Sequence, residues 1–198
     1  MQIQKEKFDY RTSGTTCVII IQLNQKIICA NAGDSRAIIV YNNGKDLLKE
    51  SKIFPLSHDF KPDLTNERKR IYEYGGIVRR AFDDIDEDGP YRVYMRGEDF
   101  PGLAMSRSIG DIESKKIGVI PNPQFIEYNI SEETKYMIIC SDGIWEFMSN
   151  KKVMEIANEY YINNDSKGLC KCLYETSVKY WNEAQCYLDD ITAIAVFF

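Results

Sequence analysis

Aspartates at the ends of apolar runs most constrain the fold of this chain. Asp142 follows the run at residues 136–140, and Asp189 precedes the run at 191–196. A third position of this kind, Asp34, lies between the runs at 26–32 and 37–41. Hard divalent cations such as Mg²⁺ and Mn²⁺ prefer oxygen ligands that are held rigidly. The pattern predicts carboxylates converging on one cleft and metal-assisted chemistry on a phosphate.

Composition is typical of a folded, acidic domain. The 198 residues are 44% hydrophobic, enough for a real core in one domain. The formal net charge is −5, and basic residues occur only in short pieces such as residues 68–70. We therefore expect neither nucleic acid nor a membrane surface as a partner.

Cysteine usage indicates a reducing compartment. The six cysteines include no Cys-x-x-Cys pair and His58 is the single histidine, so we expect no structural zinc. The first residues lack the apolar core of a signal peptide, and no apolar run approaches the ~20 residues of a membrane span. These features predict an intracellular protein, cytoplasmic or nuclear.

Hydrophobic periodicity predicts one α+β domain. Continuous apolar runs such as 17–23 predict strands covered on both faces. A hairpin is expected at residues 79–95, around the acidic loop 83–88. We interpret this loop as solvated rather than as a calcium site. Further strands are expected at 26–32, 37–41, 124–130, 136–140 and 191–198, and helices at 62–74, 149–161 and 166–181.

The order of short motifs identifies a family. The motifs are Ser13–Thr16, Asn31–Ala37, Leu56–Pro62, Glu67–Val78, Leu103–Asp111, Pro121–Pro123, Cys140–Glu146 and Asp189–Thr192. This series closely resembles the metal-dependent type 2C Ser/Thr protein phosphatases over residues 13–198. We assign residues 1–12 to an N-terminal extension and 13–198 to the catalytic domain.

The resemblance implies a β-sandwich of two antiparallel sheets flanked by helices, a four-layer α-β-β-α arrangement. It also implies a binuclear Mg²⁺ or Mn²⁺ centre at one end of the sandwich, and a third, weaker metal site. A water between the two ions attacks the phosphorus of phosphoserine or phosphothreonine, without a phosphoenzyme. Phosphoproteins are thus the expected substrates.

Carried over by motif, Asp142 and Asp189 are ligands of the binuclear pair. Asp34 is a ligand of a third site shared with Asp142, and Glu146 stands there in place of the usual Asp. Asp190 replaces the usual Asn, which adds negative charge. Phe60 replaces the usual His before Lys61-Pro62, and His58 is out of register with that position.

Each residue also has a plainer interpretation. An isolated Asp before Gly is usually a turn residue that accepts backbone N–H groups. The motifs at residues 13–16 and 106–111 are expected to shape the site rather than touch substrate. His58 is expected to be a loop histidine rather than a catalyst.

Two opening segments of the family have no counterpart in residues 1–12. One supplies an Arg that clamps the phosphate, and the other supplies metal-bridging groups and a His proposed as general acid. We therefore identify no catalytic or substrate-binding residue here. We expect this chain to lack N-terminal strands, to be inactive or nearly so, and to self-associate through an exposed sheet edge.

Two alternatives remain at this point. One is a pseudophosphatase that serves as a binding or regulatory module, which the missing Arg and His and the changes at Phe60, Glu146 and Asp190 favour. The other is a calcium-binding β-sandwich, which needs more oxygen ligands per ion than the sequence offers.

Overall fold

The computed structural model describes residues 10–44, 46–80 and 89–198. Contacts divide the chain into two compact units. Unit 1 consists of Met1–Cys17, Ala32–Asp34 and Asp59–Gln124. Unit 2 consists of Val18–Asn31, Ser35–His58 and Phe125–Phe198.

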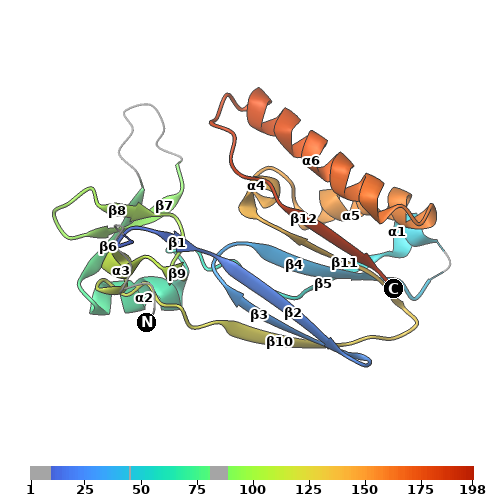
Figure 1. Ribbon diagram of the computed structural model, residues 1–198, viewed down its shortest axis with the longest axis horizontal. Coiled ribbons are helices and arrows are strands. Elements are labelled where there is room, and N and C mark those ends of the chain that lie inside the picture. Colours follow the sequence, from blue (N-terminus) through green and yellow to red (C-terminus); the bar gives the residue numbers. More distant parts are fainter. Residues whose placement is uncertain (1–9, 45, 81–88) are drawn as a thin grey trace. The chain divides into compact units, whose positions relative to one another are not determined.

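Unit 2 contains two sheets (Figure 1). The antiparallel four-stranded sheet has the order β12 (Ala193–Phe197), β11 (Thr134–Cys140), β4 (Arg36–Tyr41) and β5 (Lys52–Pro55). The three-stranded sheet has the order β10 (Gln124–Asn129), β3 (Lys26–Ala32) and β2 (Cys17–Leu23). The strands predicted at 17–23, 26–32, 37–41, 124–130, 136–140 and 191–198 are confirmed to within a few residues.

Alternation along β4 and β11 places the four-stranded sheet at the centre of unit 2. Ile38 and Val40 pack with the helices, whereas Ala37 and Ile39 pack with residues of the three-stranded sheet. All four side chains are fully buried, because successive residues of a strand point to opposite faces. The predicted burial of both faces is therefore confirmed for β4.

Helices cover the outer face of the four-stranded sheet (Figure 1). They are α4 (Asp142–Trp145), α5 (Asn150–Ile162) and α6 (Ser166–Glu183), and the short helix α1 (Leu47–Glu50) contacts α5. Ser149 begins α5 as predicted, since its side chain accepts a hydrogen bond from the Lys152 amide at 3.2 Å. None of the helices in the described part of the chain combines the length and hydropathy needed to cross a bilayer.

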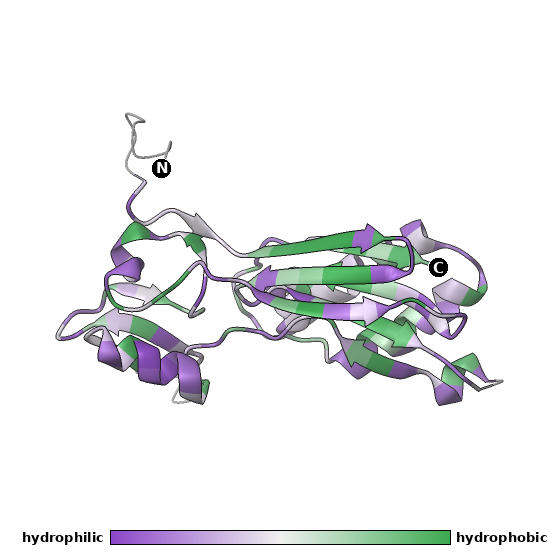
Figure 2. Ribbon diagram, turned by 90° about the horizontal axis from the view of Figure 1, so that it is seen from below, coloured by the Kyte–Doolittle hydropathy of each residue, from purple (hydrophilic) through white to green (hydrophobic). Residues whose placement is uncertain are grey.

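The outward face of the three-stranded sheet exposes several apolar side chains beside the Lys26–Glu127 ion pair. Ile19, Ile21 and Leu23 on β2 and Phe125 on β10 are each at least half exposed. Figure 2 shows β2 green, and thus hydrophobic, along most of its length. The prediction that the run at 17–23 is covered on both faces is wrong for this strand. Its other face, with Val18 and Ile20, does pack between the sheets.

Unit 1 contains an antiparallel sheet with the order β6 (Gly76–Arg80), β7 (Tyr91–Met95) and β8 (Pro101–Leu103). β1 (Gly14–Thr15) pairs with β9 (Ile109–Gly110), and the helices are α2 (Thr65–Glu73) and α3 (Ile112–Lys115). Pairing of β6 with β7 confirms the predicted hairpin. Its acidic loop, 83–88, lies outside the described residues.

The start of the first long helix differs from the prediction. The helix α2 begins at Thr65, not at Pro62. The Leu64 amide donates to the Lys61 carbonyl at 3.3 Å, so Pro62 occupies the second position of a turn. A fixed φ suits Pro to that position as well as to a first helical turn, and the sequence does not separate the two.

Candidate functional site

Asp142 lies where β11 ends and α4 begins. Cys140 ends the strand, Ser141 precedes the helix, and Asp142 is its first residue. A carboxylate in the first turn of a helix is stabilised by the backbone N–H groups there. Trp145 anchors this turn, because its indole donates to the carbonyls of Cys140 at 3.0 Å and Arg36 at 3.2 Å.

Ser141 ties the Asp189–Asp190 segment to the same end of the sheet. Its hydroxyl donates to the Asp190 carbonyl at 3.0 Å and accepts from the Thr192 amide at 3.0 Å. The Ser141 amide in turn donates to the Thr192 carbonyl at 3.1 Å. Asp142 and Asp189 therefore adjoin the same end of the β11–β12 pair, where Cys140 pairs with Ala193.

The beginning of α4 and the Asp190 backbone approach closely at Gly143. A Cβ at residue 143 would lie 2.5 Å from the Asp190 carbonyl oxygen, so this contact requires glycine. The Gly143 carbonyl accepts from the Trp181 indole at 2.7 Å and from the Ser177 hydroxyl, both on α6. Gly143 thus joins the long helix, α4 and the aspartate segment.

Glu146 caps the C-terminal end of α4, one turn after Asp142. Its amide donates to the Asp142 carbonyl at 2.9 Å, and the (i, i+4) spacing places both side chains on one face. We name Asp142, Glu146, Asp189 and Asp190 the sheet-end site. The Glu146, Asp189 and Asp190 side chains are exposed, and Asp142 is half-buried.

The sheet-end site offers the donors that Mg²⁺ and Mn²⁺ prefer, carboxylate oxygens on a fixed backbone. One of these oxygens, Asp189 Oδ1, accepts from the Asp190 amide at 2.7 Å. Across residues 10–44, 46–80 and 89–198, no three His, Cys, Asp or Glu side chains are grouped so as to hold a metal ion. The residues fit a metal site in the kind of donor they offer, and their assignment as ligands stays a prediction.

Asp34 lies in unit 1 and is 1% exposed. Its Oδ2 accepts from Lys61 Nζ at 2.6 Å, while its Oδ1 is buried with no hydrogen-bond partner in the part of the chain that is described. A buried carboxylate oxygen without a donor is uncommon and fits a position for a cation. The third ion that Asp34 is predicted to share with Asp142 remains a prediction.

A buried ion cluster supports the Asp34 region within unit 1. Glu67, 3% exposed, accepts from Arg70 and Arg107 at 2.7 Å each and from the Ser106 hydroxyl at 2.7 Å. Burial raises the pKa of Glu67, but the hydrogen bonds from Arg107, Arg70 and Ser106 outweigh it and lower the pKa to about 2. Glu67 is therefore a charged structural residue.

Phe60 has a packing role. Its ring is buried and lies under the Arg107 guanidinium, 3.7 Å from the ring centre. Its amide donates to the Gly33 carbonyl at 3.0 Å, next to Asp34. His58 is exposed, as expected of a loop histidine, and its carbonyl accepts from the Asn31 side chain at 2.8 Å. The change from His to Phe at position 60 is accommodated by stacking.

Sequence reasoning did not assign roles to Ser141, Lys61 or Glu67. Each stands inside a motif that was recognised, at Cys140–Glu146, Leu56–Pro62 and Glu67–Val78. One partner of each lies 27 to 49 residues away in the sequence, a distance that hydrophobic periodicity does not report. The only local indication that these three residues matter is that each stands inside a motif of the family.

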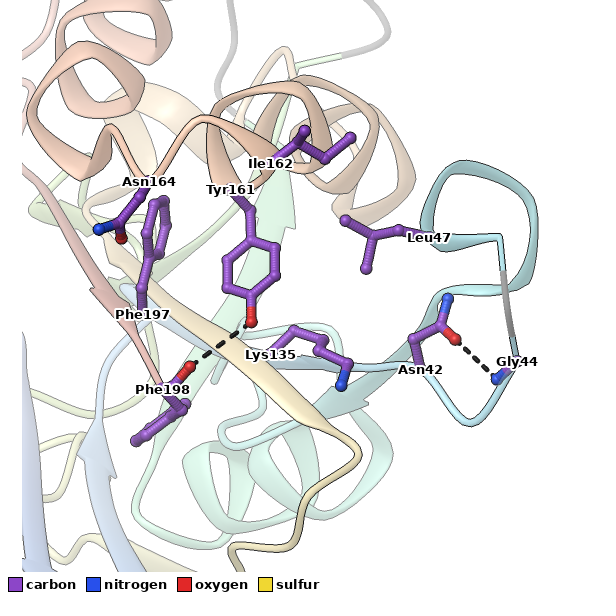
Figure 3. Close-up of a pocket in the computed structure, with 9 residues that line it drawn as sticks. All are labelled: Asn42, Gly44, Leu47, Lys135, Tyr161, Ile162, Asn164, Phe197 and Phe198. Atoms are coloured by element: carbon purple, nitrogen blue, oxygen red, sulfur yellow. Dashed lines mark hydrogen bonds between the residues drawn. The ribbon is translucent and has the colours of Figure 1, made fainter.

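A cavity of about 600 Å³ lies at the other end of the four-stranded sheet (Figure 3). Lys135 lines it near the start of β11, and Phe197 lines it at the end of β12, both remote from Asp142 and Asp189. Tyr161 donates to the Phe198 carbonyl at 3.5 Å. The described lining residues include no carboxylate side chain, so the cavity is separate from the sheet-end site.

Comparisons with known proteins match nearly the whole chain. The family model described as "Protein phosphatase 2C" matches residues 2–183. "Probable protein phosphatase 2C 73" of Arabidopsis thaliana is 34% identical over 96% of this chain and 49% of its own length. "Probable protein phosphatase 2C 12" of Oryza sativa subsp. japonica is also 34% identical, over 96% of this chain and 47% of its own. The chain thus spans about half the length of the curated relatives it matches.

Two solved structures show the fold. A serine-threonine phosphatase 2C from Toxoplasma gondii has a TM-score of 0.82 at 23% identity, covering 100% of this chain and 60% of that one. A C. elegans sex determining protein has a TM-score of 0.68 at 19% identity, covering 92% of this chain and 39% of that one. The predicted α+β fold of antiparallel sheets and helices is confirmed.

Proposed function

Because the chain belongs to the protein phosphatase 2C family, we propose that its protein is a metal-dependent Ser/Thr phosphatase. Its substrates are proteins carrying phosphoserine or phosphothreonine. The observation that carries the proposal is the joining of Asp142 and Asp189 to one sheet end by the hydrogen bonds of Ser141. An intracellular location, cytoplasmic or nuclear, is part of the proposal and is supported by six free cysteines.

Asp142 and Asp189 would hold the ions. Mg²⁺ or Mn²⁺, when bound, would lower the pKa of a bound water and neutralise charge on the phosphoryl oxygens. Ser141 fixes the spacing between the two aspartate backbones, and Gly143 permits their close approach. Glu146 and Asp34 are each proposed as a further metal ligand. Rigid placement matters because a shift of 1 Å in a reacting group can lower a rate by about 10²-fold.

The surroundings of Phe60, which replaces the His usual in the family, weaken the pseudophosphatase alternative. Phe60 stacks under Arg107 in a buried position, so a non-catalytic side chain there serves packing. A pure scaffold also has no need of Asp34, Asp142 and Asp189 together. The additional charge of Asp190 and the longer side chain of Glu146 remain the features that favour a binding module.

The proposal is tested by hydrolysis of a phosphothreonine peptide by the protein from its complete coding sequence. We expect release of phosphate with Mn²⁺ and none with EDTA. A metal-replete, folded protein without activity towards phosphoserine and phosphothreonine peptides would exclude the phosphatase and favour the binding module.

We also propose that this 198-residue chain self-associates through β2. β2 is the edge of its sheet, its seven residues carry no charge, and its outward side chains Ile19, Ile21 and Leu23 are at least half exposed. An exposed, uncharged edge strand is a template for strand pairing. A second copy of β2 in antiparallel orientation matches it in chemistry, so the occupant we propose is a second copy of the chain.

A further inference from the structure

The ion pair between Lys61 and Asp34 leaves half of a buried carboxylate unused. Lys61 Nζ lies 2.6 Å from Asp34 Oδ2, whereas Asp34 Oδ1 has no hydrogen-bond partner among the described residues. The Asp34 side chain is 1% exposed, but that of Lys61 is 32% exposed. One side of the pair is therefore fixed in the interior, and the other retains access to water.

The backbone on both sides of this pair is held in place. The Phe60 carbonyl accepts from the Ser106 amide at 2.8 Å and from the Ser106 hydroxyl at 2.9 Å, and the Phe60 amide donates to Gly33 at 3.0 Å. Ser106 is fixed in turn by Glu67 at 2.7 Å. These contacts place residue 61 beside residue 34 whatever the Lys61 side chain does.

Gly33 lets the backbone next to Asp34 lie close to Thr16. Its φ is +123°, and a Cβ there would lie 2.4 Å from the Thr16 side chain. A long, flexible side chain is thus anchored at its base next to a rigid carboxylate. An ammonium group on such a stem is a mobile single charge, unlike the planar fork of Arg.

We infer that Lys61 is a built-in competitor for divalent cations at Asp34. The ammonium neutralises Asp34 when no ion is present, and a divalent cation held by Asp34 would displace it towards solvent. Lys61 therefore sets the Mn²⁺ concentration at which Asp34 is loaded. The inference rests on the proposed function only in taking Asp34 as a metal ligand. Lys61 itself would act through Asp34 and would not touch the substrate.

Opposite substitutions at residue 61 test this inference. The measurement is the melting temperature of the 198-residue chain as a function of Mn²⁺. Lys61→Gln removes the competitor, so we expect a lower melting temperature in EDTA and a Mn²⁺ midpoint roughly tenfold lower, equivalent to about 1.4 kcal/mol. Lys61→Arg can donate to both oxygens, so we expect its midpoint to lie above that of the wild type.

Two controls separate Asp34 from other ion sites. In Asp34→Asn, any change of melting temperature with Mn²⁺ comes from ions bound elsewhere. The double variant Lys61→Gln, Asp34→Asn should show only this same change. Equal Mn²⁺ midpoints in the wild type, Lys61→Gln and Lys61→Arg would overturn the inference and leave Lys61 as a permanent counter-ion. If Lys61→Gln does not fold, an unchanged midpoint in Lys61→Arg is sufficient to overturn it.

The readout distinguishes this inference from the proposed function. A Mn²⁺ midpoint that follows residue 61 supports the inference even if the protein from the complete coding sequence has no phosphatase activity, and only that missing activity contradicts the proposed function. Phosphatase activity together with a Mn²⁺ midpoint that does not change with residue 61 supports the proposed function and contradicts the inference.

Discussion

The hydroxyl of Ser141 donates a hydrogen bond to the carbonyl of Asp190, 3.0 Å away, across 49 residues of sequence. The same hydroxyl accepts from the Thr192 amide. One small side chain therefore sets where the segment before β12 meets the end of β11. Metal ligands depend on such supporting contacts for their orientation.

Ser141→Ala should impair metal binding more than folding. It removes two exposed hydrogen bonds, whose groups water can then solvate, at a cost of about 1 kcal/mol in unfolding free energy. We expect Mn²⁺ affinity to fall by roughly tenfold or more, as for other supporting contacts of metal ligands. Ser149→Ala is the matched control, because Ser149 only caps α5. Equal Mn²⁺ affinities in the two variants would contradict a role for Ser141.

Gly143→Ala should displace the aspartate segment. The new Cβ would lie 2.5 Å from the Asp190 carbonyl oxygen, so one of the two backbones must move. We expect a loss of about 1–3 kcal/mol in unfolding free energy, measured by urea denaturation, together with weaker Mn²⁺ binding. Unchanged stability and Mn²⁺ affinity would show that the contact is not tight in solution.

Glu67 should give the protein an acid-sensitive component of stability. Its pKa is lowered from 4.5 to about 2, since the pairs with Arg107 and Arg70 outweigh burial. A lowered folded pKa contributes stability that is complete above about 4.5 and is lost as the pH falls towards about 2. We expect Glu67→Gln to lose roughly 3 kcal/mol at pH 7, in line with broken buried ion pairs.

The pH dependence of this contribution is checked by urea unfolding of the wild type and Glu67→Gln at pH 7 and near pH 2.5. The difference between the two proteins should shrink at the lower pH. Glu73→Gln is the control, because the Lys69–Glu73 pair is exposed and 3.9 Å long. A difference for Glu67→Gln that stays constant with pH would contradict the ionised cluster.

Ile21→Lys should dissociate the proposed self-association. A charge on the uncharged edge strand opposes pairing of two copies and leaves the inner face of β2 intact. Light scattering after size-exclusion chromatography should show the wild-type chain above its 22.9 kDa monomer mass and the variant at that mass. Leu48→Lys, at an exposed position on α1, is the control. A wild-type chain that is monomeric at high concentration removes the proposal.

The sequence predicts the central layers well, because there local pattern and tertiary packing agree. β4 alternates between two buried faces, and Ser149 caps α5 where the helical period begins. Prediction failed at β2 and Pro62. An apolar run does not reveal whether a neighbouring layer covers it, and Pro suits a turn as well as a helix start.

Of the candidate site, the sequence predicted the sheet end but not its supports. Asp142 and Asp189 lie near the ends of β11 and β12, where a change from apolar to acidic residues is visible locally, and their role as ligands stays a prediction. The partners of Ser141, Asp34 and Glu67 are set by long-range packing, so no local pattern reports them.

The central claim is that Asp142 and Asp189 serve one cluster of ions. Calorimetric titration with Mn²⁺ of Asp142→Asn, Asp189→Asn and the double variant tests it directly. For a shared cluster, each single substitution should remove most of the binding, and the second should add little. Losses in binding free energy that add as for two independent sites, or binding unchanged by both substitutions, would contradict the claim.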